Sequence, residues 1–108
     1  MPSSRTLMGV DFDYSGSLES GLTVHKGVDV EIKPEIVRII RNEIRRRSPV
    51  LMGACRKPLV PDSIGETLSR DYRVSPQTLS YVVPLLVEEG FCRVSDSKPF
   101  RIFINSRR

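Results

Sequence analysis

The sequence has no tryptophan, a single histidine and only two cysteines among its 108 residues. Cys55 and Cys92 are too few for a disulfide scaffold and lack the close spacing of zinc ligands, so they indicate a reducing compartment. No apolar run approaches the roughly 18 residues that a membrane-spanning helix needs. The first residues lack the apolar stretch of a signal peptide, so we expect a cytoplasmic protein with no membrane contact.

Catalytic and metal-binding motifs are equally scarce. The chain has no glycine-rich phosphate loop, and His25 has no cysteine partner at a spacing that indicates a thiolate pair. Residues 11–16 resemble the front of a calcium loop, but Leu22 stands where such a loop needs a bidentate glutamate. We therefore expect no enzyme activity, no catalytic residue, no bound metal and no cofactor.

The charge that is present is unevenly distributed. The chain has 17 basic and 13 acidic residues, and its 39% of hydrophobic residues is ordinary for one globular domain. Residues 1–33 hold three basic and five acidic side chains, whereas residues 34–108 hold 14 basic and 8 acidic ones. An arginine-rich basic part suits a phosphate backbone, although a solvated helix face with a charged tail gives the same pattern.

Alternation of apolar and polar residues predicts two strands near the N-terminus. Residues 8–14 and 28–32 each alternate with period two, as half-buried strands do, and the polar residues 15–17 are expected to end the first strand. The second strand either begins at Val28 or extends back to Val24 with a bulge near Gly27. A lone hairpin is unstable in water, so residues 1–33 are expected to pack on the domain or on a partner. The apolar face of this acidic hairpin would consist of Met8, Val10, Phe12, Tyr14, Val28, Val30 and Ile32.

Three helices are predicted from spacing and capping signals. Residues 34–47 open with a proline and repeat apolar residues at helical spacing. Ser63 and Glu66 form a capping box for a second helix, whose apolar side is Ile64, Leu68 and Tyr72. Ser75 caps a third helix, which ends at Gly90 and whose inward stripe is Leu79, Val82, Val83, Leu86 and Val87. The remaining strands are predicted at residues 50–54, 91–94 and 100–104.

This order of helix, short turn, capped helix, glycine stop and hairpin resembles the winged helix-turn-helix family. The residues that carry the resemblance are Ile64, Leu68, Val74, Ser75, Thr78, Leu79, Ser80, Val82, Leu86, Glu88, Glu89, Gly90 and the segment 91–94. The resemblance implies an α+β winged helix domain over residues 34–104, with an extra N-terminal hairpin and a basic tail at 105–108. It also implies that the helix from Ser75 lies in the major groove of double-stranded DNA and that the hairpin 91–104 is the wing.

Two departures from the family pattern bear on that mode of binding. Arg73 stands where the family usually has glycine, so we expect a longer or reshaped turn. The third helix has no basic residue between Ser75 and Gly90, so arginine cannot read guanine from it. The residues expected to touch base edges or phosphates are Ser75, Gln77, Thr78, Ser80, Tyr81, Arg70, Arg73, Arg93, Lys98 and Arg101.

An apolar patch interrupts the outer side of the third helix. Tyr81, Pro84 and Leu85 are neighbours there, and such patches usually mark a contact surface. We expect Leu85 to be covered, either by the N-terminal hairpin or by the same helix of a second copy in a homodimer. Two functions follow: a DNA-binding winged helix protein that acts as a transcriptional regulator, or a protein-interaction module of the same fold without DNA binding.

Overall fold

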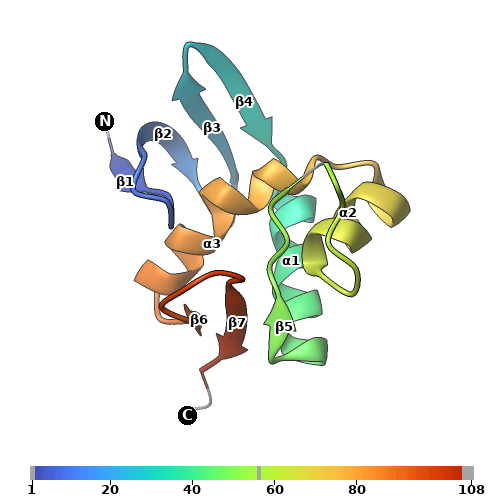
Figure 1. Ribbon diagram of the computed structural model, residues 1–108. Helices are drawn as coiled ribbons and strands as arrows, with labels where there is room; N and C mark the ends of the chain where they lie inside the picture. Colours follow the sequence, from blue (N-terminus) through green and yellow to red (C-terminus); the bar gives the residue numbers. More distant parts are fainter. Residues whose placement is uncertain (1, 56, 106–108) are drawn as a thin grey trace.

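The computed structural model describes residues 2–55 and 57–105 and has three helices and two small antiparallel sheets (Figure 1). The α+β class expected from the sequence is therefore confirmed. The elements are β1 (Ser3–Arg5), β2 (Asp11–Ser17), β3 (Gly21–Lys26), β4 (Val28–Ile32), α1 (Pro34–Arg47), β5 (Val50–Leu51), α2 (Ile64–Tyr72), the 3₁₀ turn η1 (Pro76–Thr78), α3 (Leu79–Glu88), β6 (Cys92–Val94) and β7 (Arg101–Ile104). Of the expected basic tail, residues 106–108 lie outside the described residues. Every helix in the described ranges is too short or too polar to cross a membrane.

The N-terminal sheet has four strands, where the alternation predicted only two. Its order is β1-β2-β3-β4, and each neighbouring pair is antiparallel. The predicted end of the first strand at residues 15–17 is wrong, because β2 continues through them and Ser17 pairs with Gly21. Gly16 permits the continuation: its φ is +89°, and a Cβ at this position would collide with the Gly21 carbonyl oxygen.

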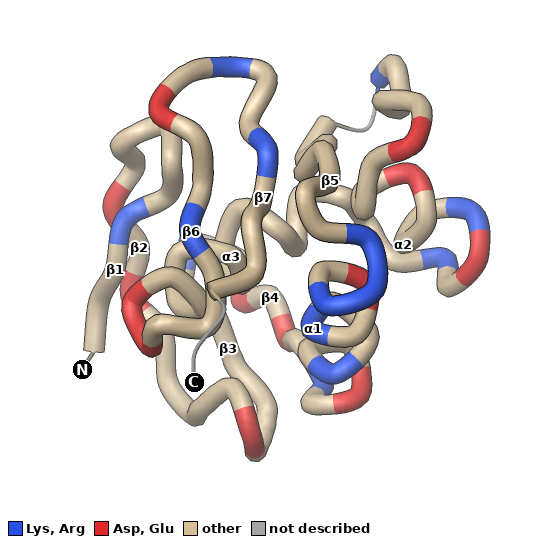
Figure 2. The backbone as a smooth tube through the Cα atoms, turned by 90° about the horizontal axis from the view of Figure 1, so that it is seen from below, with Lys and Arg blue, Asp and Glu red and all other residues tan. Residues whose placement is uncertain are grey.

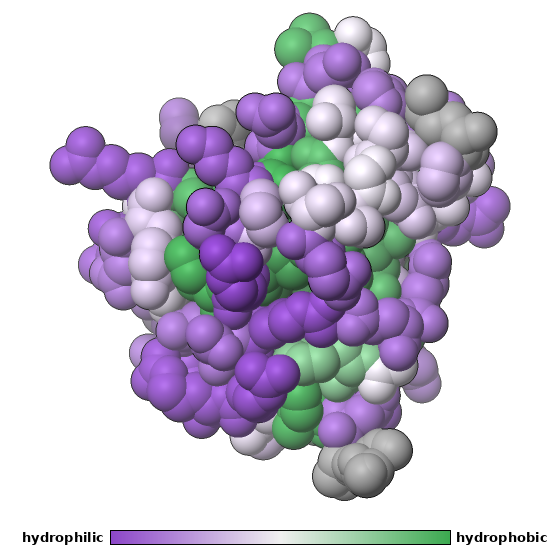
Figure 3. Space-filling model, turned by 180° about the vertical axis from the view of Figure 1, so that it is seen from behind, coloured by the Kyte–Doolittle hydropathy of each residue, from purple (hydrophilic) through white to green (hydrophobic). Residues whose placement is uncertain are grey.

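The buried face of this sheet also differs from the predicted one. Phe12 and Ile32 are buried as expected, but β3 supplies the other core residues, Leu22 and Val24. Four residues predicted for this face are exposed instead: Met8, Val10, Val28 and Val30. The first two lie in the turn between β1 and β2, and the last two lie on an edge strand whose tip projects beyond the helices (Figure 1). Figure 3 shows hydrophobic surface at this tip, where Val28 is 81% exposed.

The Ser63 cap of α2 forms as predicted, but the Glu66 carboxylate accepts from the Asp62 amide at 3.1 Å, one residue before the amide that a capping box uses. The Glu66 amide donates to Ser63 Oγ at 3.1 Å, and Ile64 and Leu68 are buried. Tyr72, which was expected on the same apolar side, is 45% exposed. This prediction is wrong because Tyr72 is the last residue of α2, where the chain leaves the helix through Arg73.

The turn after α2 needs no extra length. Arg73 itself adopts the left-handed conformation, with φ 57° and ψ 38°, and serves as the C-cap. The Val74 amide then donates to the Leu68 carbonyl at 2.9 Å, and the same oxygen also accepts from the Arg73 amide, so the helix end is closed by two backbone hydrogen bonds. The expected longer turn is therefore wrong. An arginine takes the backbone position usually held by glycine, at a conformational cost of about 1 kcal/mol.

The third predicted helix is divided, and the predicted wing gains a strand. Ser75 Oγ accepts from the Gln77 amide at 3.3 Å, but the turn that it caps is η1, and α3 follows from Leu79. Val87, predicted for the inward stripe, is 36% exposed. β5 joins the hairpin of β6 and β7 at its edge, so the C-terminal sheet has three strands in the order β5-β7-β6.

α1 has the predicted bounds and contains the only buried charged residue among those described, Glu43. Arg46 Nη2 donates to both Glu43 oxygens, at 2.7 and 2.8 Å, and Arg47 Nη1 donates at 3.1 Å. Arg47 also donates to the Thr67 hydroxyl at 2.9 Å and to the Asp62 carbonyl at 3.0 Å, which ties α1 to the start of α2. Burial, the largest single influence, disfavours the charged carboxylate, but the two arginines together outweigh it and lower the pKa of Glu43.

Glu43→Gln is expected to lower the free energy of unfolding by about 2 kcal/mol at pH 7, because both arginines lose a charged acceptor. A carboxylate with a lowered folded-state pKa stabilises the fold above its ordinary value of 4.5 and loses that contribution as the pH falls through the folded value. Urea unfolding at pH 7 and at pH 3 should therefore show a smaller difference from wild type at the lower pH. The exposed Glu31→Gln variant is the control, with an expected change within about 0.5 kcal/mol. An equal difference for Glu43→Gln at both pH values would contradict this role.

Candidate nucleic-acid interface

The outer side of α3, predicted to enter the major groove, is covered by the N-terminal sheet. Phe12 packs edge-on against Tyr81, with ring centroids 5.2 Å apart, and Leu85 is only 5% exposed. The prediction that Leu85 is covered is confirmed, and the cover belongs to the same chain. Because Leu85 borders the same hollow as Tyr14 and Leu22, the covering residues come from β2 and β3.

Polar side chains also tie this sheet to the C-terminal end of α3. The Ser4 hydroxyl of β1 donates to a Glu88 carboxylate oxygen. Arg41 of α1 donates to both oxygens of Glu89, at 2.8 and 2.9 Å, and to Glu19 of the β2–β3 turn at 3.4 Å. The hydrogen bonds that Arg41 donates to Glu89 are the largest cause of the raised pKa of Arg41. Arg41 thus links α1, α3 and the N-terminal sheet, and it is held by these acids.

The residues expected to contact DNA therefore differ in whether they are buried or exposed. Thr78 is buried at 8% exposure, Tyr81 lies beneath the N-terminal sheet, and the side chain of Ser80 borders a pocket. Pro84, the third member of the outer patch, is buried as well. The exposed residues of the set, at the start of η1 and on α2, are Arg70, Arg73, Ser75 and Gln77.

A second group of predicted residues gathers on the C-terminal sheet. Arg93 pairs with Phe103 across β6 and β7, and Arg101 pairs with Leu51 across β7 and β5. Successive residues of a strand point to opposite sides, so these four residues share the face opposite the buried Ile102. The Arg93 guanidinium lies over the Phe103 ring, 5.0 Å from its centroid. We call this surface, formed by Leu51, Arg93, Arg101 and Phe103, the cationic sheet face.

The cations of the cationic sheet face are free of acidic partners among the described residues. Neither Arg93 nor Arg101 makes an ion pair, whereas Arg41, Arg46 and Arg47 all pair with glutamates. Figure 2 shows the basic positions of β6, β7 and the last turns of α1 on the side seen from below. Arg45 of α1 is exposed there and stacks over Phe91 at 5.2 Å. This side therefore offers unpaired guanidinium groups to an anion.

Cys92 and His25 do not belong to the cationic sheet face. Burial, aided by the charge of Glu89, raises the pKa of Cys92 to about 11, so its thiol is not ionised at neutral pH. His25 Nδ1 lies 2.9 Å from Asp29 Oδ1, and its Nε2 lies 3.2 Å from Ser15 Oγ. This chain of contacts has the order of a nucleophile, a base and an orienting acid. It lies on the open outer face of the N-terminal sheet, with Asp29 64% exposed. The contact follows from the pairing of His25 with Asp29 across β3 and β4, so we assign no catalytic role to it.

Comparison with known proteins gives no match to this chain among protein-family models, curated proteins or solved structures.

Sequence reasoning missed Phe103. The signal for Phe103 was present, because period two in β7 places it on the same side as Arg101. Its contact with Arg93 depends on the register between β6 and β7, which the sequence pattern did not specify. Lys98, predicted as a phosphate contact beside Arg93 and Arg101, is exposed in the loop between β6 and β7 and borders a pocket there.

Proposed function

We propose that the protein is a winged helix protein that binds duplex DNA through the cationic sheet face, with α3 closed off by its own N-terminal sheet. The observation that carries this proposal is the pair of exposed arginines, Arg93 and Arg101, on one sheet face without acidic partners. Such groups bind phosphate oxygens well, because the guanidinium presents several donors in a fixed plane.

The order of elements supports the winged helix assignment. A capped helix, a turn at Arg73, a second capped segment and a hairpin follow one another, as in the family that the sequence resembles. The covering of Tyr81 and Leu85 favours contacts to the phosphate backbone over base readout by α3. We therefore propose binding with little sequence preference.

Fluorescence anisotropy with a random 20-base-pair duplex at several salt concentrations tests this function. Neutralising about four phosphates should give a log–log slope of affinity against salt of roughly −4. Duplexes of different sequence should bind alike. The absence of binding to any duplex at low salt would remove the proposal.

A protein-interaction module without DNA binding is the second candidate, and one observation favours it. β4 is an edge strand of the N-terminal sheet, and its Val28 is exposed at the projecting tip (Figure 3). An exposed strand edge can pair with a strand of another chain. The same anisotropy titration separates the two candidates, because this module gives no salt-dependent signal.

A further inference from the structure

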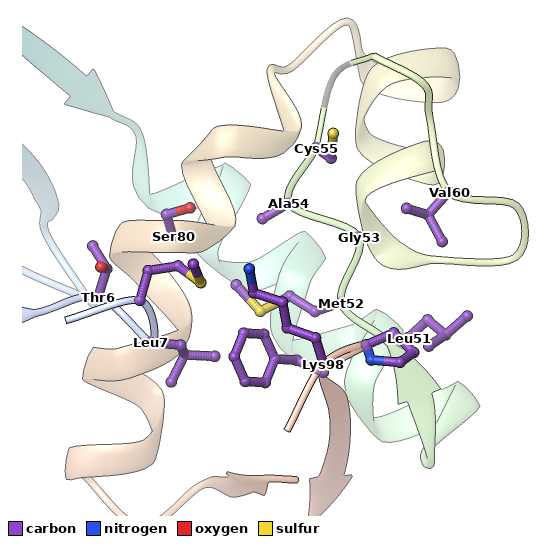
Figure 4. A pocket seen from close by; sticks show the side chains of 13 residues that line it. Thr6, Leu7, Leu51, Met52, Gly53, Ala54, Cys55, Val60, Ser80 and Lys98 are labelled. Atoms are coloured by element: carbon purple, nitrogen blue, oxygen red, sulfur yellow. The ribbon is translucent and has the colours of Figure 1, made fainter. Parts of the chain in front are cut away.

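A pocket of about 580 Å³ lies between the β1–β2 turn, the β5–α2 connection, α3 and the wing loop (Figure 4). Small-molecule sites in proteins usually measure about 300–1,000 Å³. Leu7, Met52, Val60 and Phe100 supply apolar wall from three separate segments. The pocket therefore has the size and lining of a site for a small apolar molecule.

The walls of this pocket are fixed by backbone hydrogen bonds. The Met52 amide donates to the Phe100 carbonyl at 3.0 Å, which joins the β5–α2 connection to the wing. The Gly65 amide donates to the Met52 carbonyl at 2.9 Å, which joins the same segment to α2. Because these walls are already in place, a ligand would bind without first having to order them.

Among the residues that the structure describes, Lys98 is the only charged one that lines the pocket. It makes no ion pair with any residue in the described ranges. In Figure 4 its side chain crosses the pocket from the wing loop, with the nitrogen directed toward the α3 side, where Ser80 lies. The pocket thus combines an apolar wall with one ammonium group and a hydroxyl donor.

We propose that this pocket binds a small apolar carboxylate. The hydrocarbon part would lie against Leu7, Met52 and Phe100, and the carboxylate would accept hydrogen bonds from Lys98. A carboxylate matches the site because it carries one charge, as the lysine does. A phosphate monoester carries close to two charges and three acceptor oxygens, which a single lysine does not satisfy. This site borders the cationic sheet face at Leu51, which belongs to both surfaces, so its test is made without DNA.

Isothermal titration calorimetry with decanoate, below its micelle concentration, tests the proposal. Decanol is the matched probe, since it has the same chain length without the charge. We expect decanoate to bind one-to-one, and decanol to bind roughly tenfold more weakly because it forgoes the charge-assisted hydrogen bond. Equal affinities for the two probes, or no decanoate binding, would overturn the proposal.

Two variants locate the ligand within the pocket. Lys98→Met keeps the apolar stem and should weaken decanoate binding roughly tenfold while leaving decanol unchanged. Lys26→Met removes the same charge from an exposed position at the end of β3 and should leave decanoate binding unchanged. Ala54→Phe should abolish binding of both probes, because the side chain of Ala54 points into the pocket (Figure 4).

The variants also set the conditions under which the proposal fails. Decanoate affinity in Lys98→Met equal to that of wild type would show that the ammonium group does not hold the carboxylate. Wild-type affinity in Ala54→Phe would place the ligand outside the pocket. Thermal melting of each variant checks its folding, and Lys98→Met decides the question alone if Ala54→Phe does not fold.

Discussion

Leu85→Lys is expected to lower the free energy of unfolding by about 3–5 kcal/mol, which is a large share of the total for a domain of this size. Leu85 is 5% exposed beneath the N-terminal sheet, so the substitution removes a buried apolar side chain and places a charge there. Chemical denaturation followed by circular dichroism measures the change. Because the cover belongs to the same chain, the loss should be independent of protein concentration.

Val87→Lys is the matched control for this substitution. Val87 is on the same helix but 36% exposed, so a lysine there should change stability by less than about 1 kcal/mol. Sedimentation should give the same mass for wild type and both variants. A shift of Leu85→Lys from dimer to monomer with unchanged folding would instead show that a second copy covers α3. Unchanged stability together with higher DNA affinity would show that α3 is open to the groove.

The double variant Arg93→Gln/Arg101→Gln is expected to weaken binding to any duplex by about 30-fold, since two phosphate contacts of roughly 1 kcal/mol each are lost. The slope of affinity against salt should fall by about one for each arginine. The loss should be the same for different sequences, because phosphates carry no sequence information. Anisotropy titrations at two salt concentrations measure both effects.

Lys26→Gln/Lys33→Gln removes the same two charges from exposed residues at the ends of β3 and β4, away from the cationic sheet face. If general positive charge were responsible, this control would weaken binding as much as the arginine variant does. We expect it to change affinity by less than about threefold. Equal losses in the two double variants would refute the cationic sheet face as the binding surface.

The three helices and the C-terminal hairpin could be predicted because their signals are local. Pro34 at a helix start, the Ser63–Glu66 capping box and Ser75 each satisfy backbone groups within a few residues along the chain. The structure confirms the bounds of α1 and the capping contacts of Ser63 and Ser75. It corrects the turn at Arg73. A turn position that favours glycine also accepts arginine here, because arginine adopts the same backbone angles at modest cost.

In the N-terminal region, local signals did not predict which residues are buried. Alternation alone placed Val28 and Val30 on a buried face, but burial depends on whether a helix lies opposite the strand. α3 lies opposite the middle of the sheet, so Phe12, Leu22 and Val24 are buried while the tip of β4 is exposed. Pairing by β1 added a further strand that no period-two pattern in the sequence had indicated.

By itself, the sequence determined the α+β class, the starts of α1 and α2 and the acidic-to-basic division of the chain. Only the tertiary structure decided which basic residues remain free to bind an anion. Arg41, Arg46 and Arg47 meet glutamates, whereas Arg93 and Arg101 emerge on an open sheet face. The physical reason is that ion pairing and burial depend on contacts between residues far apart in the chain, such as Arg41 with Glu89, and no local pattern encodes such contacts.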